Sequence, residues 1–592
     1  MDRQTIAGFL VIFLLLMVWM WYNAPPPKPP SDQPTQAQVS DTAKAVIAEK
    51  PRPVEGKPTD PYGRFFSSRM QGSERFIKIE TDLFIAELST RGATVRRWEL
   101  KKHKTWDGYP VQLVDYEKNG DLSLLFTTSD GRLVNTHDLY FDTDVSLNRV
   151  KIENNFEFKI NFTLPSTNGG SIVKTLTFRN DNYGFGCDVR MVNLGNVISN
   201  FEYQLVWESG LRYTEHNSID ESGFAAAFSY AGKELTEIDA PSAEQKVQKD
   251  QTGVVEWVAS RTKYFALAII PQSPKSEGAY VEGTHRSMPD EGALEAYTVA
   301  VRMPFKGGAG EEGSFKIYFG PLEHERLTAY DNGLENIMSL GWAWLIRPIA
   351  EYVFLPVMGG LHYLVPNWGV VIILFSILIK IALHPLTKTS MKSMKKMQAL
   401  QPMMDEIRQK HKDDPQKMNK TIMNLYKEYG VNPAGGCVPM LLQMPILYAL
   451  YAVFRAHIDL RQAGFFWWIT DLSIPDTVVS LPFNIPLFGM KDISGIALLM
   501  GITMFVQQKM TVKDPRQKMM VWLMPVMLTL VFNSLPSGLN LYYAVFNLLS
   551  IAQQYLINKQ HDNEPLRKVD PKKKSSGGIF RRFPDEFRKL KK

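Results

Sequence analysis

Polar side chains recur along one face of the last apolar segment of the sequence. The segment from 519 to 558 contains no Asp, Glu, Lys or Arg. Five of its polar residues follow one another at intervals of three or four positions: Asn540, Tyr543, Asn547, Ser550 and Gln554. This spacing places them on one helical face. Because an unpaired polar group in hydrocarbon is costly, we expect that face to contact protein or water rather than lipid.

A single charge lies within the apolar segments. Lys380 shares a helical face with Ser376, His384 and Thr387, about 9 Å from the cytoplasmic end of its helix at 1.5 Å per residue. An ionisable residue inside a membrane helix marks a functional site by default. Alternatively, the long side chain extends to the lipid headgroups, but a lysine in that arrangement has no need of Ser376 one turn deeper on the same face.

Shorter polar sets occur on the other apolar segments: Gln443, Thr503 with Gln507, and Thr529 with Asn533. Several helices with one polar face predict a shared hydrophilic interior. Two alternatives remain open. Asn547 and Gln554 could instead form hydrogen bonds between helices, and Tyr542 and Tyr543 could be packing aromatics.

The lengths of the apolar segments predict six membrane spans, because a span needs about 20 residues. The first, at 1–23, is expected to be a retained anchor, since the large residues Trp19, Met20, Trp21 and Tyr22 stand where a signal peptidase needs small ones. The other five spans are predicted at 367–386, 432–456, 493–510, 519–535 and 536–558.

The distribution of charge predicts the orientation. Residues 1–366 contain 37 Lys and Arg against 46 Asp and Glu, whereas residues 367–592 contain 30 against 15. The connecting segments alternate: 387–431, 511–518 and 559–592 are basic, and 457–492 is not. Positive charge accumulates on the cytoplasmic side, so we expect both termini in the cytoplasm and residues 24–366 outside. Buried helices of a soluble protein would make this alternation accidental.

The long segment between the first two spans predicts three parts. Residues 24–60 are rich in Pro, Gln, Ser and Thr and cannot bury a core, so they form a linker. Residues 61–330 show short alternating runs separated by turn residues, which is typical of a large antiparallel β-sandwich. Residues 331–366 are apolar but interrupted by charges and prolines, which favours an amphipathic helix in the outer interface of the membrane.

No pattern in this segment indicates catalysis or metal binding. Its five histidines have neither metal-ligand spacing nor a nucleophile motif around them: His103, His137, His216, His285 and His324. Cys187 and Cys437 are the only cysteines, and they lie in different halves, so they provide neither a disulfide framework nor a metal site. We therefore predict no catalytic residue, no metal and no cofactor.

The cytoplasmic segment 387–431 predicts a helical hairpin broken at Asp414-Pro415. Methionines lie along its first arm: Met391, Met394, Met397 and Met403. Flexible thioethers suit varied apolar partners, although a methionine stripe more often reflects simple packing. The basic tail at 559–592 suits anionic lipid or ribosomal RNA, with a solvated topology determinant as the alternative.

Several motifs, in this order, resemble the YidC-type membrane protein insertases: Asn367-Trp368-Gly369, His384-Pro385-Leu386-Thr387-Lys388, Asn432-Pro433-Ala434-Gly435-Gly436-Cys437, Gln443-Met444-Pro445-Ile446, and Pro536-Ser537-Gly538-Leu539 followed by Tyr542-Tyr543. The front half resembles the long Gram-negative form of the family. The resemblance implies a polytopic α-helical bundle in the cell inner membrane, with a five-helix insertase core and an N-terminal anchor. It also implies a periplasmic antiparallel β-supersandwich, similar to sugar mutarotases but without enzymatic activity.

The resemblance further implies a hydrophilic groove that is open to the cytoplasm and to lipid. Its cation, usually arginine in the family, corresponds to Lys380, and its hydroxyl and essential tyrosine correspond to Ser376 and Tyr543. Lysine keeps the charge but loses the planar fork of arginine. Further groove residues are expected at Gln443, Thr503, Gln507, Asn533 and Asn547. The apolar face along which a client slides is assigned to Leu447, Met500, Val531 and Tyr542.

The expected partners are nascent membrane proteins, membrane lipids and the Sec translocon. The ribosome and the signal-recognition-particle receptor are expected to bind the hairpin and the basic tail, and no small-molecule substrate is expected. Two other functions remain open. A secondary transporter should show internal repeats, which we do not find. A membrane-anchored periplasmic carbohydrate-active enzyme needs a convergent acid–base pair, which the histidines do not suggest.

Overall fold

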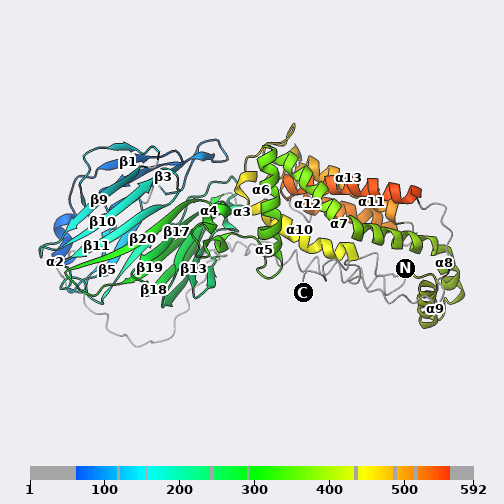
Figure 1. Ribbon diagram of the computed structural model, residues 1–592, viewed down its shortest axis with the longest axis horizontal. Helices are drawn as coiled ribbons and strands as arrows, with labels where there is room; N and C mark the ends of the chain where they lie inside the picture. Colours follow the sequence, from blue (N-terminus) through cyan, green and yellow to red (C-terminus); the bar gives the residue numbers. More distant parts are fainter. Residues whose placement is uncertain are drawn as a thin grey trace, which may run out of the picture.

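The computed structural model describes residues 62–115, 120–154, 156–240, 246–289, 292–431, 438–484, 490–512, 518–560 and 568. The predicted anchor at 1–23, the linker at 24–60 and nearly all of the tail lie outside these residues. Figure 1 shows the described chain as a β domain and a helical bundle placed end to end.

The β domain contains three sheets. The nine-stranded sheet has the order β14 (Glu234–Ile238), β13 (Ala226–Ala231), β16 (Trp257–Arg261), β17 (Phe265–Ser273), β20 (Gly310–Pro321), β11 (Phe185–Val192), β10 (Ser171–Arg179), β9 (Glu157–Pro165) and β7 (Asp142–Thr143). The six-stranded sheet has the order β15 (Lys246–Thr252), β18 (Gly278–Ser287), β19 (Ala293–Pro304), β12 (Glu202–Trp207), β5 (Ser123–Thr127) and β6 (Leu133–Asn135). The five-stranded sheet has the order β4 (Pro110–Gln112), β3 (Thr94–Lys104), β2 (Phe84–Ser89), β1 (Phe76–Glu80) and β8 (Arg149–Lys151).

The sheets share one aromatic core. Phe319 on β20 lies 5.1 Å from Trp98 on β3 and 5.0 Å from Trp207 on β12, measured between ring centroids. All three side chains are buried. The strands pair antiparallel except for β1 with β8, which are parallel. Since alternate residues of a strand face opposite sides, the alternating sequence pattern correctly predicted a large, mainly antiparallel β-sandwich.

Short helices complete the β domain: α2 (Gly63–Phe66), α3 (Ser218–Ser222), α4 (His324–Thr328) and the 3-10 turns at Ser67–Arg69, Thr136–Asp138 and Leu334–Ile337. The expected amphipathic helix at 331–366 is shorter than predicted. It consists of α5 (Ile346–Ile349), a π-helical turn (Ala350–Phe354) and α6 (Leu355–Leu364). Gly341, which precedes α5, has φ 85°, and a Cβ there would lie 2.6 Å from Ile346 Cγ2. In Figure 1, α6 runs across the end of the bundle that faces the β domain.

Seven helices follow within the described residues: α7 (Trp368–Ala399), α8 (Gln401–Lys410), α9 (Pro415–Glu428), α10 (Val438–Ala456), α11 (Gly495–Thr511), α12 (Lys518–Phe532) and α13 (Ser537–Gln560), with a 3-10 turn at Ile458–Leu460. Strands β21 (Thr477–Ser480) and β22 (Asp492–Ser494) form a hairpin between α10 and α11. Helix α13 packs against α7, α10 and α11, and α11 also packs against α12.

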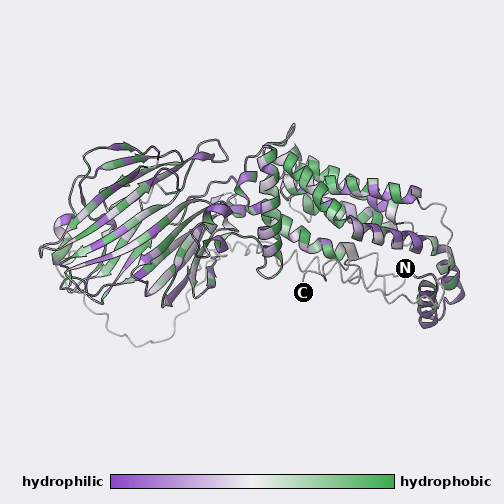
Figure 2. Cartoon of the chain, viewed as in Figure 1, coloured by the Kyte–Doolittle hydropathy of each residue, from purple (hydrophilic) through white to green (hydrophobic). Residues whose placement is uncertain are grey.

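The helix is not interrupted at the predicted boundary between the second span and the hairpin. Helix α7 continues through Pro385 to Ala399, so the span and the first arm form one rod. The break between the two arms of the hairpin lies at Asp414-Pro415, as predicted. There Asp414 caps α9, because its Oδ1 accepts a hydrogen bond from Lys417 N at 3.0 Å. Figure 2 shows hydrophobic residues over the bundle and hydrophilic ones over α8, α9 and the adjoining end of α7.

By length and composition, α7 is the one described helix that could cross a membrane. The apolar stretches Leu441–Ala456 in α10 and Val521–Phe532 in α12 are shorter. The prediction of six spans therefore stays a prediction.

Candidate intramembrane site

Lys380 projects from α7 into the helical bundle, where it is 7% exposed. Its Nζ donates a hydrogen bond to Ser550 Oγ on α13 at 2.6 Å and lies 4.6 Å from the ring centroid of Phe546. Ser550 is the only hydrogen-bond acceptor, and no carboxylate pairs with the amine, among the residues that the structure describes. An ammonium group has three donors, so two remain for water or for an anion. The amine points at α13, unlike a lysine that extends to the headgroups.

Polar contacts between α7 and α13 continue toward the C-terminal ends of both helices. Gln553 Nε2 lies 3.2 Å from His384 Nδ1 and 3.2 Å from Thr387 Oγ1. Lys395 Nζ donates to Asn558 O at 2.8 Å. Sequence reasoning missed Gln553, although it follows Ser550 by three positions and therefore belongs to the same face. Gln554, which was predicted, bonds within its own helix to Asn558 at 2.9 Å.

Ser376 is fully buried one turn from Lys380, toward the N-terminal end of α7. Its hydroxyl donates to Ile372 O of its own helix at 2.7 Å. A Ser hydroxyl can donate one bond and still accept others, so its oxygen remains available as an acceptor. It shares the burial of Lys380 but makes no hydrogen bond to it in this structure.

Two further groove residues meet at the contact of α13 with α11. Asn547 Nδ2 donates to Thr503 Oγ1 at 3.4 Å, and both residues are buried. Gln507 follows Thr503 by one turn and is half-buried. Gln443 on α10 is also half-buried, and it has no hydrogen bond to the other groove residues within the described ranges.

Asn533 lies elsewhere. Its Oδ1 accepts a hydrogen bond from Ser494 N at 2.8 Å, and its Nδ2 donates to Asp492 O at 2.7 Å. These bonds tie the end of α12 to β22 and to the start of α11. The structure therefore gives Asn533 a role in joining elements and does not place it beside Lys380. The polar spacing on α12 could not distinguish these two positions.

The two tyrosines pack inside the bundle. The Tyr543 ring lies 5.3 Å from Phe532 and 5.1 Å from Tyr542, both edge-on. Tyr542 also stacks on Phe546 at 5.8 Å. Neither hydroxyl has a hydrogen-bond partner among the described residues. Because a buried hydroxyl usually finds a partner, these two groups are candidates to bind water or a passing polar chain.

The four residues predicted to form the apolar face along which a client slides differ in how deeply they are buried. Leu447 and Val531 are half-buried, whereas Met500 and Tyr542 are fully buried. The latter two are covered because α11 and α13 pack closely together. A client could touch Met500 or Tyr542 only if these helices separated.

The comparisons with known proteins match both parts of the chain. The family "60Kd inner membrane protein" matches residues 360–564, and "YidC periplasmic domain" matches residues 76–352. Membrane protein insertase YidC of Chlorobium phaeovibrioides is 40% identical over 589 residues, which cover 98% of this chain and 100% of the relative. The chain belongs to the YidC family of membrane protein insertases. The resemblance inferred from its motifs is thereby confirmed.

A second relative of this insertase is the YidC protein of Prosthecochloris aestuarii, which is 40% identical over 581 residues, with 96% of this chain and 97% of the relative covered. The solved structure titled "Active YidC insertase crystal structure with the first transmembrane domain resolved" is 19% identical and aligns with a TM-score of 0.34. That alignment covers 84% of this chain and 95% of the solved one.

The helical hairpin of this insertase, formed by α8 and α9, has its own small core. It consists of buried residues from α8, α9 and the turns beside them: Leu400, Met404, Leu425, Tyr426, Tyr429 and Val431. Met397 packs against this core, Met391 and Met394 are half-buried, and Met403 is 38% exposed. Of the four predicted methionines, Met403 is thus the most exposed, while Met397 fits the packing alternative.

Ion pairs fasten the β domain to the helices, and sequence reasoning missed them. Asp220 of α3 pairs with Lys263 at 2.7 Å and with Arg455 near the end of α10. Arg461 Nε lies 2.6 Å from Glu215 Oε1. Burial raises the pKa of Asp220, but the Lys263 and Arg455 charges outweigh burial and hold that pKa below its usual value. The partners are far apart in sequence, so no local spacing could reveal them.

His103 lies near this junction and makes the stability of the folded protein depend on pH. Burial, reinforced by the Arg461 charge, lowers the pKa of His103 from 6.5 to about 4. Between these values the unfolded chain takes up a proton that the folded chain does not, so stability falls as the pH falls. At pH 5 the loss should be about 2 kcal/mol. We expect the melting temperature to drop more between pH 7 and pH 5 in the parent than in His103→Phe, and equal drops would contradict this.

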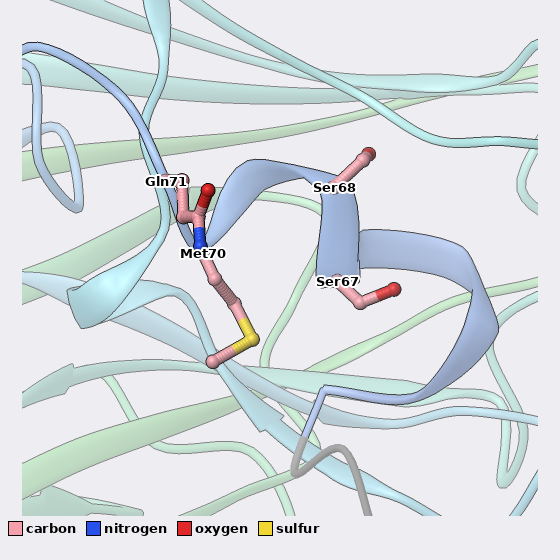
Figure 3. A pocket seen from close by; sticks show the side chains of 4 residues that line it. All are labelled: Ser67, Ser68, Met70 and Gln71. Carbon is pink, nitrogen blue, oxygen red and sulfur yellow. The ribbon is translucent and has the colours of Figure 1, made fainter.

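The β domain also has an open hollow beside α2, lined by Ser67, Ser68, Met70 and Gln71 (Figure 3). No charged side chain is among these four residues, and the hollow therefore gives no indication of a particular ligand.

Proposed function

We propose that this membrane protein insertase binds the acidic translocated segment of a nascent membrane protein at Lys380, while the apolar segment passes into lipid. One observation supports this proposal above all. The Lys380 ammonium is enclosed by α7 and α13 with a single hydroxyl partner, so its charge is not neutralised by a carboxylate among the described residues. Because a buried, unpaired cation is costly, an incoming carboxylate would relieve that cost.

The driving force comes from the client. Burial in lipid contributes about 0.8 kcal/mol per CH₂ group, so a whole apolar span outweighs the cost of moving a few polar residues. Hydrated side chains around Lys380 and Thr503 would shorten the distance over which those residues leave water. Asn547 and Gln553 extend this polar path between the helices. The protein then lowers a barrier and needs no covalent step.

The membrane arrangement belongs to the same proposal. The protein is an inner-membrane insertase with a periplasmic domain, as its family shows. We infer six spans with both termini in the cytoplasm, supported by the basic segments 387–431 and 559–592. The hairpin of α8 and α9, with Met403 exposed, would then face the ribosome and the signal-recognition-particle receptor. The Sec translocon would associate with the bundle from within the membrane.

Deletion of residues 61–320 tests the insertase against an enzyme located in the β domain. An enzyme would lose its activity, whereas an insertase whose site lies around Lys380 should keep at least half of its insertion rate. The assay is insertion of a single-span client into proteoliposomes, with protease protection as the readout. A loss of insertion by tenfold or more, from a protein that still reconstitutes at the parent level, would contradict the proposed location of the site.

A further inference from the structure

Exposed aromatic side chains occur on two loops at the junction of the β domain and the helices. Trp106 and Tyr109, on the turn between β3 and β4, are 58% and 69% exposed. Phe466 and Trp467, in the segment after α10, are 52% and 78% exposed. These four residues are here termed the aromatic collar. Large exposed aromatics that cluster in this way usually mark an interaction surface.

Contacts place both loops at the same end of α7. Gln462 Nε2 donates to Lys104 O at 3.1 Å and to Thr105 O at 3.0 Å. Three residues further on, Phe465 packs so closely on Gly369 that a Cβ there would lie 2.0 Å from Phe465 Cδ2. Gly369 is the second residue of α7. The collar therefore lies beside the first turn of the candidate span.

The loops hold their aromatics outward by specific contacts. Thr105 N donates to Tyr109 O at 2.7 Å, which closes the turn. The Trp106 ring meets His216 edge-on at 4.5 Å, yet most of its surface stays free. Trp467 stacks on Phe466 at 4.5 Å and has φ 53°, a left-handed conformation that is unfavourable for a bulky residue. A strained and exposed Trp suggests a function for its position.

We propose that the aromatic collar sits in the headgroup region of the outer leaflet and seats the β domain on the lipid surface. Trp and Tyr prefer this region because their rings are apolar and their N–H or O–H groups are polar. Lys102 and Lys104 lie at the end of β3, just before the turn, and are exposed, so their ammonium groups can reach lipid phosphates. The proposal rests on the proposed orientation, in which the start of α7 lies at the outer interface.

Spin-label accessibility in nanodiscs tests this placement on the full chain. Nitroxides are attached at Trp106→Cys, Tyr109→Cys or Trp467→Cys, in a background with Cys187→Ala and Cys437→Ala. The ratio of accessibility to oxygen, which partitions into lipid, over accessibility to a water-soluble nickel chelate reports depth. We expect this ratio to be at least threefold higher at the three collar positions than at Leu133→Cys. Leu133 on β6 is a matched control because its side chain is 63% exposed. It also follows Arg132, whose side chain lies close to Gly63 of α2, so Leu133 belongs to the part of the β domain around α2.

A label at Leu378→Cys on α7 distinguishes failure of the collar proposal from failure of the proposed membrane arrangement. The native Leu378 side chain is 44% exposed. If Leu378 reports lipid while the collar labels match Leu133, the collar proposal is wrong and the span stands. If Leu378 also reports water, the placement of α7 in the membrane is wrong. Collar labels shielded from both reagents would indicate a protein contact and would likewise overturn the proposal.

Discussion

Lys380→Glu is expected to slow the insertion of clients with acidic translocated tails at least tenfold. The change converts attraction into repulsion at a site that is 7% exposed. Two unit charges 4 Å apart interact by about 4 kcal/mol at an effective dielectric constant of 20, and a tenfold change in rate needs only about 1.4 kcal/mol. Lys380→Arg should be tolerated, because arginine keeps the charge and adds donors in a planar fork. Lys380→Ala should fall between the two.

The measurement is the initial insertion rate in proteoliposomes, with two matched controls. Lys392→Glu makes the same charge change on the same helix, outside the contact with Ser550, and should change the rate less than threefold. A client whose tail carries Asn and Gln in place of Asp and Glu should be insensitive to Lys380→Glu. Equal rates for the parent and Lys380→Glu with the acidic client would show that electrostatic capture is wrong.

Asp220→Ala should loosen the attachment of the β domain to the helices. It leaves the Lys263 ammonium, which is 3% exposed, and the Arg455 guanidinium without their shared carboxylate. Removal of one partner from a buried charge cluster costs about 3 kcal/mol or more. We expect a broadened distribution of distances between spin labels on the β domain and on α10, measured by pulsed electron resonance, together with a lower melting temperature.

Asp142→Ala is the matched control, because its pair with Arg69 is 65% exposed on the carboxylate side and lies within the β domain. An exposed pair of this kind contributes roughly 0–1 kcal/mol, so the distance distribution should not change. Insertion by Asp220→Ala should stay near the parent rate, since the ion pair positions the domain and not the groove. A narrow, parent-like distribution for Asp220→Ala would contradict the role of this cluster.

The helical site shows what local spacing can and cannot predict. Intervals of three and four residues correctly placed Ser550 and Asn547 on an inward face of α13, because helix geometry alone sets that face. The same argument placed Asn533 in the groove, although its amide joins α12 to β22. Spacing defines a face but not the neighbour across from it. The burial of Tyr542 and Met500 depends on how closely α13 and α11 approach, which the sequence pattern does not contain.

The β domain shows a similar limit. Strands with clean apolar alternation can be predicted from the sequence, but β3 lacks that signal because charged residues surround Val95, Trp98 and Leu100, which are its buried apolar side chains. Strands β13 to β15 and β18 also lack a clear alternating pattern, since small or polar residues fill much of their length. The Asp220 cluster lay beyond prediction because its partners meet only after the two parts of the chain have folded together.

Site-specific photo-crosslinking to a stalled nascent chain tests the central claim most directly. A photoreactive side chain is placed at Gln507, which lies one turn from Thr503 on the inward side of α11, or at Ile502, which is 62% exposed on the outside of the same helix. The client carries an acidic tail before one apolar span. We predict that the client crosslinks to Gln507 at least fivefold more strongly than to Ile502, and that Lys380→Glu reduces this signal. Equal crosslinking at both positions, or a stronger signal from Ile502, would contradict a client path through the interior of the bundle.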